Sequence, residues 1–128
     1  LGWYMAIAGM IFLDRSNYEN AMKSMRDAGN EIKKGKNIIS FPEGTRSKTN
    51  QIGLFKKGSF IIAKEGKIPI VPVAIKGSNE INPSGTLILR KGIIKTKIGK
   101  PIYNKDQETA ESFAKRTRKE VEFMVNSL

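Results

Sequence analysis

The chain contains neither cysteine nor histidine. Without cysteine it can form no disulfide, no thiolate metal site and no cysteine nucleophile. Without histidine it also lacks the commonest general base and the commonest metal ligand. Acid–base chemistry would therefore need carboxylates, lysines or a segment outside these residues, and we expect no bound metal and no cofactor.

Long hydrophobic runs are missing as well. A helix that spans a bilayer needs roughly 20 apolar residues, and the apolar stretches here are far shorter. Residues 1–13 also lack the basic start of a signal peptide. Because the chain opens inside an apolar run without an initiator methionine, we expect Leu1 to be an internal residue of a longer protein. We see no linker-like stretch, so residues 1–128 are expected to form a single partial domain.

Acidic residues are scarce relative to basic ones. The chain has 23 lysines and arginines against 12 aspartates and glutamates, which gives a formal net charge of +11. This excess favours polyanions, phosphate esters or anionic membrane surfaces as partners, without choosing among them. We interpret its densest run as a solvated face, with a membrane-facing or nucleic-acid-facing patch as the alternative. The basic residues of that run are Arg90, Lys91, Lys95, Lys97 and Lys100.

Apolar residues at helical spacing predict four helices. The most regular one runs from Ala110 to the end of the chain, and another starts at Tyr18 and stops at Gly35. A short helix is expected to be capped by Ser59 and ended by Gly66. A further short helix is expected at residues 3–9.

Five segments have the pattern of strands. The first three are apolar enough to be buried, and the last two look like a half-exposed antiparallel pair. Pro69 and Pro72 each remove a ladder donor from the third segment, which predicts a free edge or a bulge there. The segments are residues 10–13, 37–41, 68–75, 86–90 and 93–98.

The alternation of strands and helices predicts an α/β fold, a mostly parallel sheet with flanking helices. In such a sheet the carboxyl ends of the strands share one edge, where ligands bind. Polar clusters follow the first three strands directly, at Asp14-Arg15, at Glu43 to Arg46 and at Lys76 to Ser78. The topology therefore predicts that these clusters meet in one crevice.

This crevice has the chemistry of a phosphate site. Arg15 and Arg46 are permanently charged forks, and each can bind a phosphate through two parallel hydrogen bonds. Gly44 lets the backbone approach an anion closely. Lys56 and Lys57 precede a helix start, where amide donors and the helix dipole also favour an anion.

Each of these residues also has a structural interpretation. In so basic a chain, Arg15 alone would more often be a surface charge, and Thr45 could be a turn residue. For Glu43 we place a structural role, bonded to loop amides or to a nearby arginine, above a role in proton transfer. Arg46 is the strongest candidate, because it follows Glu43-Gly44-Thr45 directly after an expected buried strand.

Three ordered blocks resemble the 1-acyl-sn-glycerol-3-phosphate acyltransferases. Residues 9–15 are similar to the second conserved block of that family, residues 41–47 to the third and residues 70–73 to the fourth. Phe55-Lys56-Lys57-Gly58 and Gly2-Trp3 also match the stretches between and before these blocks. The similarity ends near residue 100 and leaves the last helix unassigned.

The resemblance implies a glycerolipid acyltransferase-like fold, truncated at its N-terminus, in a membrane-associated enzyme of phospholipid biosynthesis at the cytoplasmic face. Such enzymes transfer an acyl group from acyl-coenzyme A or acyl-carrier protein to the free hydroxyl of 1-acyl-sn-glycerol-3-phosphate, giving phosphatidic acid, and we expect an anionic membrane surface as a further partner. By position, the residues implied to hold the acceptor phosphate are Arg15, Glu43, Gly44, Thr45, Arg46 and Lys56. Those implied to shape the apolar wall or the acyl-chain side are Val71, Pro72 and Val73.

In this family the base is the histidine of a His-x-x-x-x-Asp block, which the sequence lacks. We therefore expect that block upstream of Leu1, and we expect the 128 residues alone to be inactive. The alternatives are a non-catalytic module that binds nucleic acid or anionic lipid, and a lipid-binding pseudoenzyme. Nucleic acid is not expected as a partner, because aromatic residues are not interleaved with the basic runs.

Overall fold

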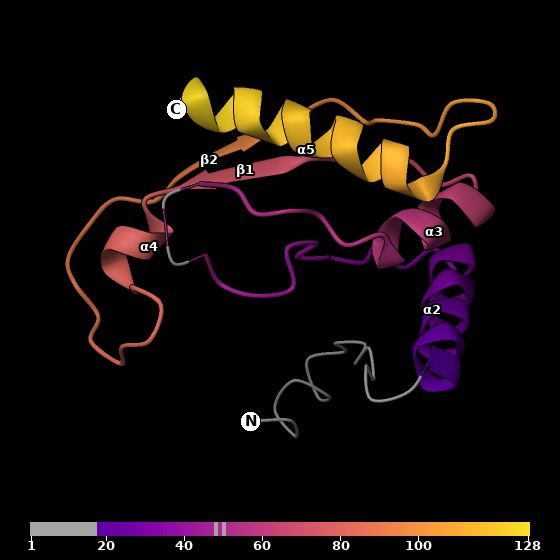
Figure 1. The fold of residues 1–128 in the computed structure, drawn as a ribbon, viewed down its shortest axis with the longest axis horizontal. Coiled ribbons are helices and arrows are strands. Elements are labelled where there is room, and N and C mark those ends of the chain that lie inside the picture. The colour runs from indigo at the N-terminus through magenta and orange to yellow at the C-terminus, as the bar shows by residue number, and fades with distance from the viewer. Residues whose placement is uncertain (1–17, 48, 50) are drawn as a thin grey trace. The chain divides into compact units, whose positions relative to one another are not determined.

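The computed structural model describes residues 18–47, 49 and 51–128, without the side chains of residues 18–22 and 25. The chain divides into two compact units, residues 1–40 and residues 41–128, whose elements are labelled in Figure 1. The helix expected at residues 3–9, the strand expected at residues 10–13 and the candidate Arg15 lie outside the described residues.

In the first unit the structure describes one helix, α2, Tyr18–Lys33. The predicted helix is confirmed, and so is its stop at Gly35. This glycine has φ +88°, and its N–H closes the last turn with a 2.9 Å hydrogen bond to the carbonyl of Ile32. A positive φ costs glycine little because it has no Cβ, which is why glycine so often ends a helix.

Residues 37–41 do not form the buried strand that their β-branched pattern predicts. Ile39 is 86% exposed and Phe41 75% exposed, and the segment pairs with no strand among the described residues. A segment of this composition becomes a buried strand only where a neighbouring strand supplies its hydrogen bonds and covers its side chains. The described part of the chain supplies no such neighbour.

The sheet of the second unit consists of two antiparallel strands, β1, Val73–Lys76, and β2, Lys95–Ile98. Their register places Val73 opposite Ile98 and Lys76 opposite Lys95. The expectation of a mostly parallel sheet is therefore wrong for the described residues, because the one ladder found there joins β1 to a later segment that runs back along it.

β1 is shorter than the segment 68–75 because two prolines interrupt the ladder. Between Pro69 and Pro72, Ile70 forms an isolated antiparallel bridge with Ile102. Pro72 still accepts a hydrogen bond, from the N–H of Gly99 at 2.9 Å. The regular pairing begins only at the residue after the second proline, as the loss of two N–H donors requires.

The expected antiparallel pair of residues 86–90 and 93–98 is also wrong. Only the second of these segments contains a strand, β2, and it pairs with β1. The N–H of Arg90 instead donates at 2.8 Å to the carbonyl of Ile81, the last residue of the short helix α4, Ser78–Ile81. The first segment is therefore tied to the end of a helix and pairs with no strand that the structure describes.

The core of the second unit lies between α3, Gly58–Glu65, and α5, Ala110–Asn126. The rings of Phe60 and Phe113 meet edge to face with centroids 5.4 Å apart, and both side chains are buried. Figure 1 shows α5 lying along β1, against which it also packs. The long helix predicted from Ala110 is confirmed.

The short helix α3 is confirmed as well, but its expected cap is not. Lys57 occupies the N-cap position and makes no side-chain hydrogen bond to the helix, so the assignment of Ser59 as the cap is wrong. Ser59 is the second residue of the helix, so it lies within the first turn and not at the N-cap position before it. The predicted stop at Gly66 is confirmed. No helix in the described part of the chain combines the length and apolar character needed to cross a bilayer.

Candidate functional site

The described residues between 41 and 57 belong to a loop, called the loop 41–57, whose two ends are joined through the backbone. The N–H of Lys56 donates to the carbonyl of Pro42 at 2.8 Å. Gly44, two residues after Pro42, has φ +69°. Its N–H donates to the carbonyl of Phe41 at 3.0 Å and so closes a tight turn. The backbone of Lys56 therefore lies beside the turn that precedes Arg46 in the chain.

The carboxylate of Glu43 is bound to the opposite arm of this loop. Its Oε2 accepts the N–H of Gly53 at 2.7 Å. A carboxylate that accepts a backbone N–H across ten residues fixes the loop, and this agrees with the structural interpretation of Glu43. A Cβ on Gly53 would lie 2.9 Å from the same oxygen, so a larger residue here would displace the carboxylate of Glu43.

Arg118 on α5 binds the same arm of the loop from the other side. Its Nε donates to the carbonyl of Gly53 and its Nη2 to the carbonyl of Ile52, both at 2.9 Å. Its guanidinium also forms a 2.7 Å ion pair with Glu122 one helical turn away. Sequence reasoning missed this residue, because nothing in the local pattern of a basic helix distinguishes an arginine that bonds 65 residues away.

The other end of the loop is anchored by aromatic packing. The ring of Phe55 stacks on that of Phe60 at 6.2 Å, and Phe60 in turn meets Phe113 of α5. Lys56 and Lys57 come directly after this anchor and directly before α3, whose first turn has no side-chain cap. The N–H groups of that first turn that have no acceptor among the described residues, together with the helix dipole, favour an anion near these two lysines.

The two basic candidates on the loop are not neutralised by acidic side chains. Arg46 and Lys56 are exposed, and neither has an ion pair within the described residues. The amide of Gly44 is used inside its turn, whereas the amides of Thr45 and Arg46 donate to no described residue. Since the backbone hydrogen bond from Lys56 to Pro42 closes the loop, Glu43, Gly44 and Lys56 lie together at its base.

Other sequence candidates stand apart from this loop or cannot be placed. Pro72 is buried, while Val71 and Val73 are 48% and 47% exposed. Val71 and Pro72 lie just before β1 and Val73 is its first residue, and no hydrogen bond between described residues joins them to the loop. Arg15 lies outside the described residues, so the convergence of Arg15 with Arg46 stays a prediction.

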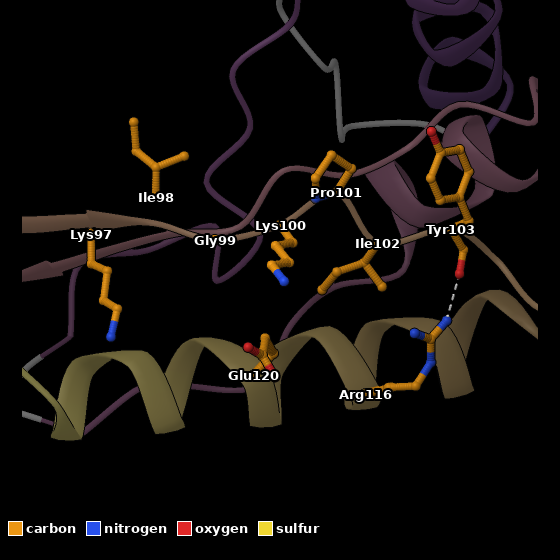
Figure 2. Close-up of a pocket in the computed structure, with 9 residues that line it drawn as sticks. All are labelled: Lys97, Ile98, Gly99, Lys100, Pro101, Ile102, Tyr103, Arg116 and Glu120. Carbon is orange, nitrogen blue, oxygen red and sulfur yellow. Dashed lines mark hydrogen bonds between the residues drawn. The ribbon is translucent and has the colours of Figure 1, made fainter.

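A separate open groove of about 770 Å³ runs between residues 97–103 and α5. Figure 2 shows Lys100 and Glu120 between the two walls, with Arg116 toward one end. Lys97 donates to Ser127 at 2.8 Å and is thereby held at the rim. No local sequence pattern predicts this groove, because it exists only where residues 97–103 pack beside α5.

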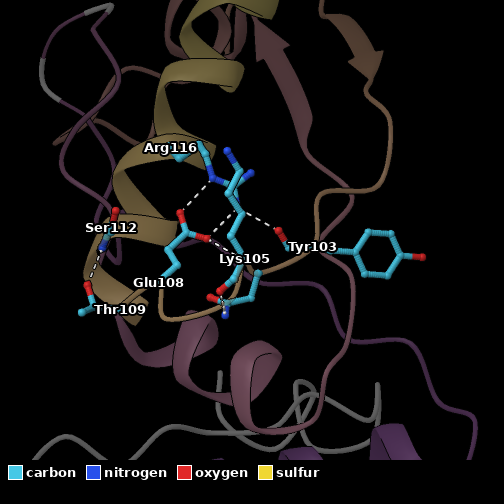
Figure 3. A network of polar contacts seen from close by, with 7 residues as sticks. Tyr103, Lys105, Glu108, Thr109, Ser112 and Arg116 are labelled. Atoms are coloured by element: carbon cyan, nitrogen blue, oxygen red, sulfur yellow. Dashed lines mark hydrogen bonds and ion pairs between the residues drawn. The ribbon is translucent and has the colours of Figure 1, made fainter.

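The arginine of the groove belongs to a structural network, drawn in Figure 3. Arg116 binds both carboxylate oxygens of Glu108, at 2.9 and 2.7 Å, and donates to the carbonyl of Tyr103 at 2.8 Å. The hydrogen bonds from Arg116 lower the pKa of Glu108 to about 2. Because this arginine is already paired, the groove offers fewer free charges than its lining suggests.

Comparison with known proteins adds an independent line of evidence. A protein-family model described as Acyltransferase matches residues 1–76. The 1-acyl-sn-glycerol-3-phosphate acyltransferase of Saccharomyces cerevisiae is 37% identical over 123 residues, which is 92% of this chain and 41% of that protein. The chloroplastic 1-acyl-sn-glycerol-3-phosphate acyltransferase BAT2 of Brassica napus is 38% identical over 104 residues, 80% of this chain and 30% of that protein.

A solved structure resembles the fold. The crystal structure of the 1-acyl-sn-glycerophosphate (LPA) acyltransferase from Thermotoga maritima matches with a TM-score of 0.83 at 31% identity, over 98% of this chain and 50% of that one. The chain therefore spans half, or less, of the length of these relatives. The long final helix is included in the structural match, although it lies beyond the part that the family model covers.

Proposed function

Because the chain belongs to the 1-acyl-sn-glycerol-3-phosphate acyltransferase family, we propose that it acts in acyl transfer to 1-acyl-sn-glycerol-3-phosphate. The acyl donor is acyl-coenzyme A or acyl-carrier protein, and the product is phosphatidic acid. Within this reaction the loop 41–57 binds the phosphate of the acceptor. The observation that carries this assignment is that Arg46 and Lys56, both exposed and without acidic partners among the described residues, lie on one loop closed at its base.

In this proposal Arg46 and Lys56 neutralise the phosphate and so fix the glycerol backbone. The free hydroxyl then attacks the thioester carbonyl, its oxygen forms the new ester bond, and the carbon–sulfur bond breaks to release the thiol. The general base that takes the hydroxyl proton is not a histidine of these 128 residues, since there is none. Its expected place is the His-x-x-x-x-Asp block, outside the sequence described here.

The lipid nature of the acceptor and the product places the reaction at a membrane surface. We propose the cytoplasmic face, where anionic lipids attract a chain with a net charge of +11. In this proposal Val71, Pro72 and Val73 contribute to the apolar side of the acceptor site, while Arg15 and Thr45 complete the phosphate site.

The phosphate assignment is tested with Arg46→Ala. A charge-assisted hydrogen bond contributes roughly 1.5–3 kcal/mol, so we expect this variant to bind a short-chain, soluble lysophosphatidic acid roughly 10 to 100 times more weakly. Isothermal titration calorimetry below the critical micelle concentration measures the dissociation constant, and the matching monoacylglycerol, which has no phosphate, serves as the reference ligand. Lys64→Ala, at an exposed lysine on α3, is the control.

Two results would contradict the assignment. One is equal binding of the phosphate-bearing and phosphate-free lipids by the 128-residue chain without substitutions, called the parent chain from here on. The other is an Arg46→Ala variant that retains the parent's affinity for lysophosphatidic acid.

A further inference from the structure

Gly53 is held from both sides through its backbone. Its N–H donates to Glu43 at 2.7 Å, and its carbonyl accepts from Nε of Arg118 at 2.9 Å. Arg118 also reaches the neighbouring carbonyl of Ile52 through Nη2 at 2.9 Å. The chain of contacts therefore runs from α5, through the backbone of Gly53, to the residue that precedes Gly44 in the turn.

The geometry of this contact requires an arginine. Two adjacent carbonyls are bound by two different nitrogens of one planar group, an arrangement that a lysine ammonium cannot reproduce because it is a point donor on a flexible stem. Glu122 pairs with the same guanidinium at 2.7 Å, one turn along α5, and so holds it in orientation. The side chain of Arg118 is 29% exposed, which leaves these bonds partly shielded from water.

Gly53 makes the link sensitive to a single methyl group. A Cβ at this position would lie 2.9 Å from the Oε2 atom of Glu43. The atom that would have to move is the end of a flexible side chain, so the fold could absorb the change. The hydrogen bond between Glu43 and Gly53 could not persist unchanged.

We propose that Arg118 is a positioning residue for the acceptor-phosphate site. It acts through Gly53 and Glu43 to fix the turn at residues 42–44, and hence the direction in which Arg46 leaves the loop. This inference rests on the proposed function of the loop. It assigns a role to α5, which lies outside the residues that the family model matches.

The test compares three variants with the parent chain. Arg118→Gln removes the charge, Arg118→Lys keeps the charge but not the fork, and Gly53→Ala breaks the link from the opposite side without touching Arg118. The control is Lys119→Gln, a neighbouring exposed lysine on the same helix. For each protein we measure the dissociation constants of short-chain lysophosphatidic acid and of the matching monoacylglycerol, the thermal midpoint, and amide hydrogen exchange over residues 43–57.

We expect Arg118→Gln to bind lysophosphatidic acid about tenfold more weakly, the loss of about one charge-assisted hydrogen bond, with unchanged affinity for monoacylglycerol. Arg118→Lys should restore only part of the affinity. Gly53→Ala should show the same selective loss at an unchanged thermal midpoint. Amide exchange in the loop should become faster in all three variants and stay at the parent rate in Lys119→Gln.

The outcomes separate the two proposals. If Arg46→Ala weakens phosphate binding while Arg118→Gln and Gly53→Ala do not, the positioning role is wrong and the phosphate site stands. If Arg118→Lys restores the parent's affinity in full, charge alone matters and the positioning role is again wrong. If the parent chain does not prefer lysophosphatidic acid over monoacylglycerol, the phosphate site itself is wrong and the positioning role falls with it. Should Arg118→Gln not fold, Gly53→Ala decides.

Discussion

Among single residues, Glu108 is a carboxylate whose surroundings bear directly on acid stability. Its side chain is 8% exposed and is bound by Arg116 at 2.9 and 2.7 Å. The hydrogen bonds from Arg116 lower its pKa to about 2 in the folded chain, against roughly 4.3 when unfolded. A carboxyl with a lowered pKa stabilises the fold above the unfolded pKa, and this contribution is lost as the pH falls towards the folded pKa.

We therefore expect Glu108→Gln to lower the free energy of unfolding by about 1–3 kcal/mol at pH 7, and this gap to shrink steadily between about pH 4.5 and pH 2. Urea unfolding of parent and variant at several pH values measures the gap. Glu111→Gln is the control, since that side chain is 69% exposed in its ion pair with Lys115. A gap that stays constant across this range would show that the ion pair is not its source.

We expect the same substitution to change the stability in opposite directions at Thr117, inside α5, and at Thr109, the N-cap of α5. Thr117 is 2% exposed, and its hydroxyl has no hydrogen-bond partner within the described part of the chain. Thr109 is the N-cap of α5, and its hydroxyl accepts the N–H of Ser112 at 3.1 Å. A buried hydroxyl without a partner destabilises, whereas an N-cap hydroxyl stabilises.

Thr117→Val should therefore raise the free energy of unfolding by about 1 kcal/mol, and Thr109→Val should lower it by about 1 kcal/mol. Equilibrium denaturation of the two variants beside the parent measures both changes. The prediction for Thr117 is wrong if its valine variant is destabilised, because the hydroxyl would then have a partner that stabilises the fold.

At the scale of whole elements, the sequence predicted best what depends on neighbours in the chain. The helices from Tyr18 and from Ala110 follow from apolar spacing, and the stops at Gly35 and Gly66 follow from local backbone chemistry. Helical hydrogen bonds join residues four apart, so a local window contains the information that they need.

Strands were predicted less well, because their partners are not local. Residues 68–75 were correctly identified as containing a strand, but nothing in them names residues 95–98 as its antiparallel partner. The segment 37–41 has the composition of a strand and finds no partner among the described residues. A strand pattern thus identifies a segment that can pair, whereas the pairing itself depends on the rest of the fold.

The same distinction applies to the candidate site. Local motifs identified the loop residues Glu43 to Arg46 and Lys56, and the structure places their backbones on one closed loop. Arg118 could not be found in this way, since it contacts the loop across 65 residues and lies in a helix where a basic residue is ordinary. Motifs thus located the groups proposed to touch the ligand, but not the side chain proposed to hold those groups in place.

For the molecule as a whole, excess positive charge and exposed aliphatic side chains coincide in one stretch. Between residues 82 and 105 there is no acidic residue. Leu87, Ile93 and Ile98 of this stretch are 101%, 77% and 73% exposed. We propose that this surface, rather than being a solvated face, contacts an anionic lipid membrane, whose headgroups would attract the basic side chains while its acyl region would receive the aliphatic ones.

The electrostatic and the hydrophobic contributions to membrane binding respond differently to salt. The chain should sediment with phosphatidylglycerol-containing vesicles but only weakly with phosphatidylcholine vesicles at 0.1 M salt. Raising the salt to 1 M reduces the Debye length from roughly 10 Å to 3 Å and should remove most of the binding. Leu87→Ser combined with Ile93→Ser should abolish the part that survives, whereas Ile39→Ser, equally exposed but outside this stretch, should not. Equal binding to both kinds of vesicle, or tighter salt-sensitive binding to single-stranded RNA than to anionic vesicles, would rule out the membrane as the partner of this surface.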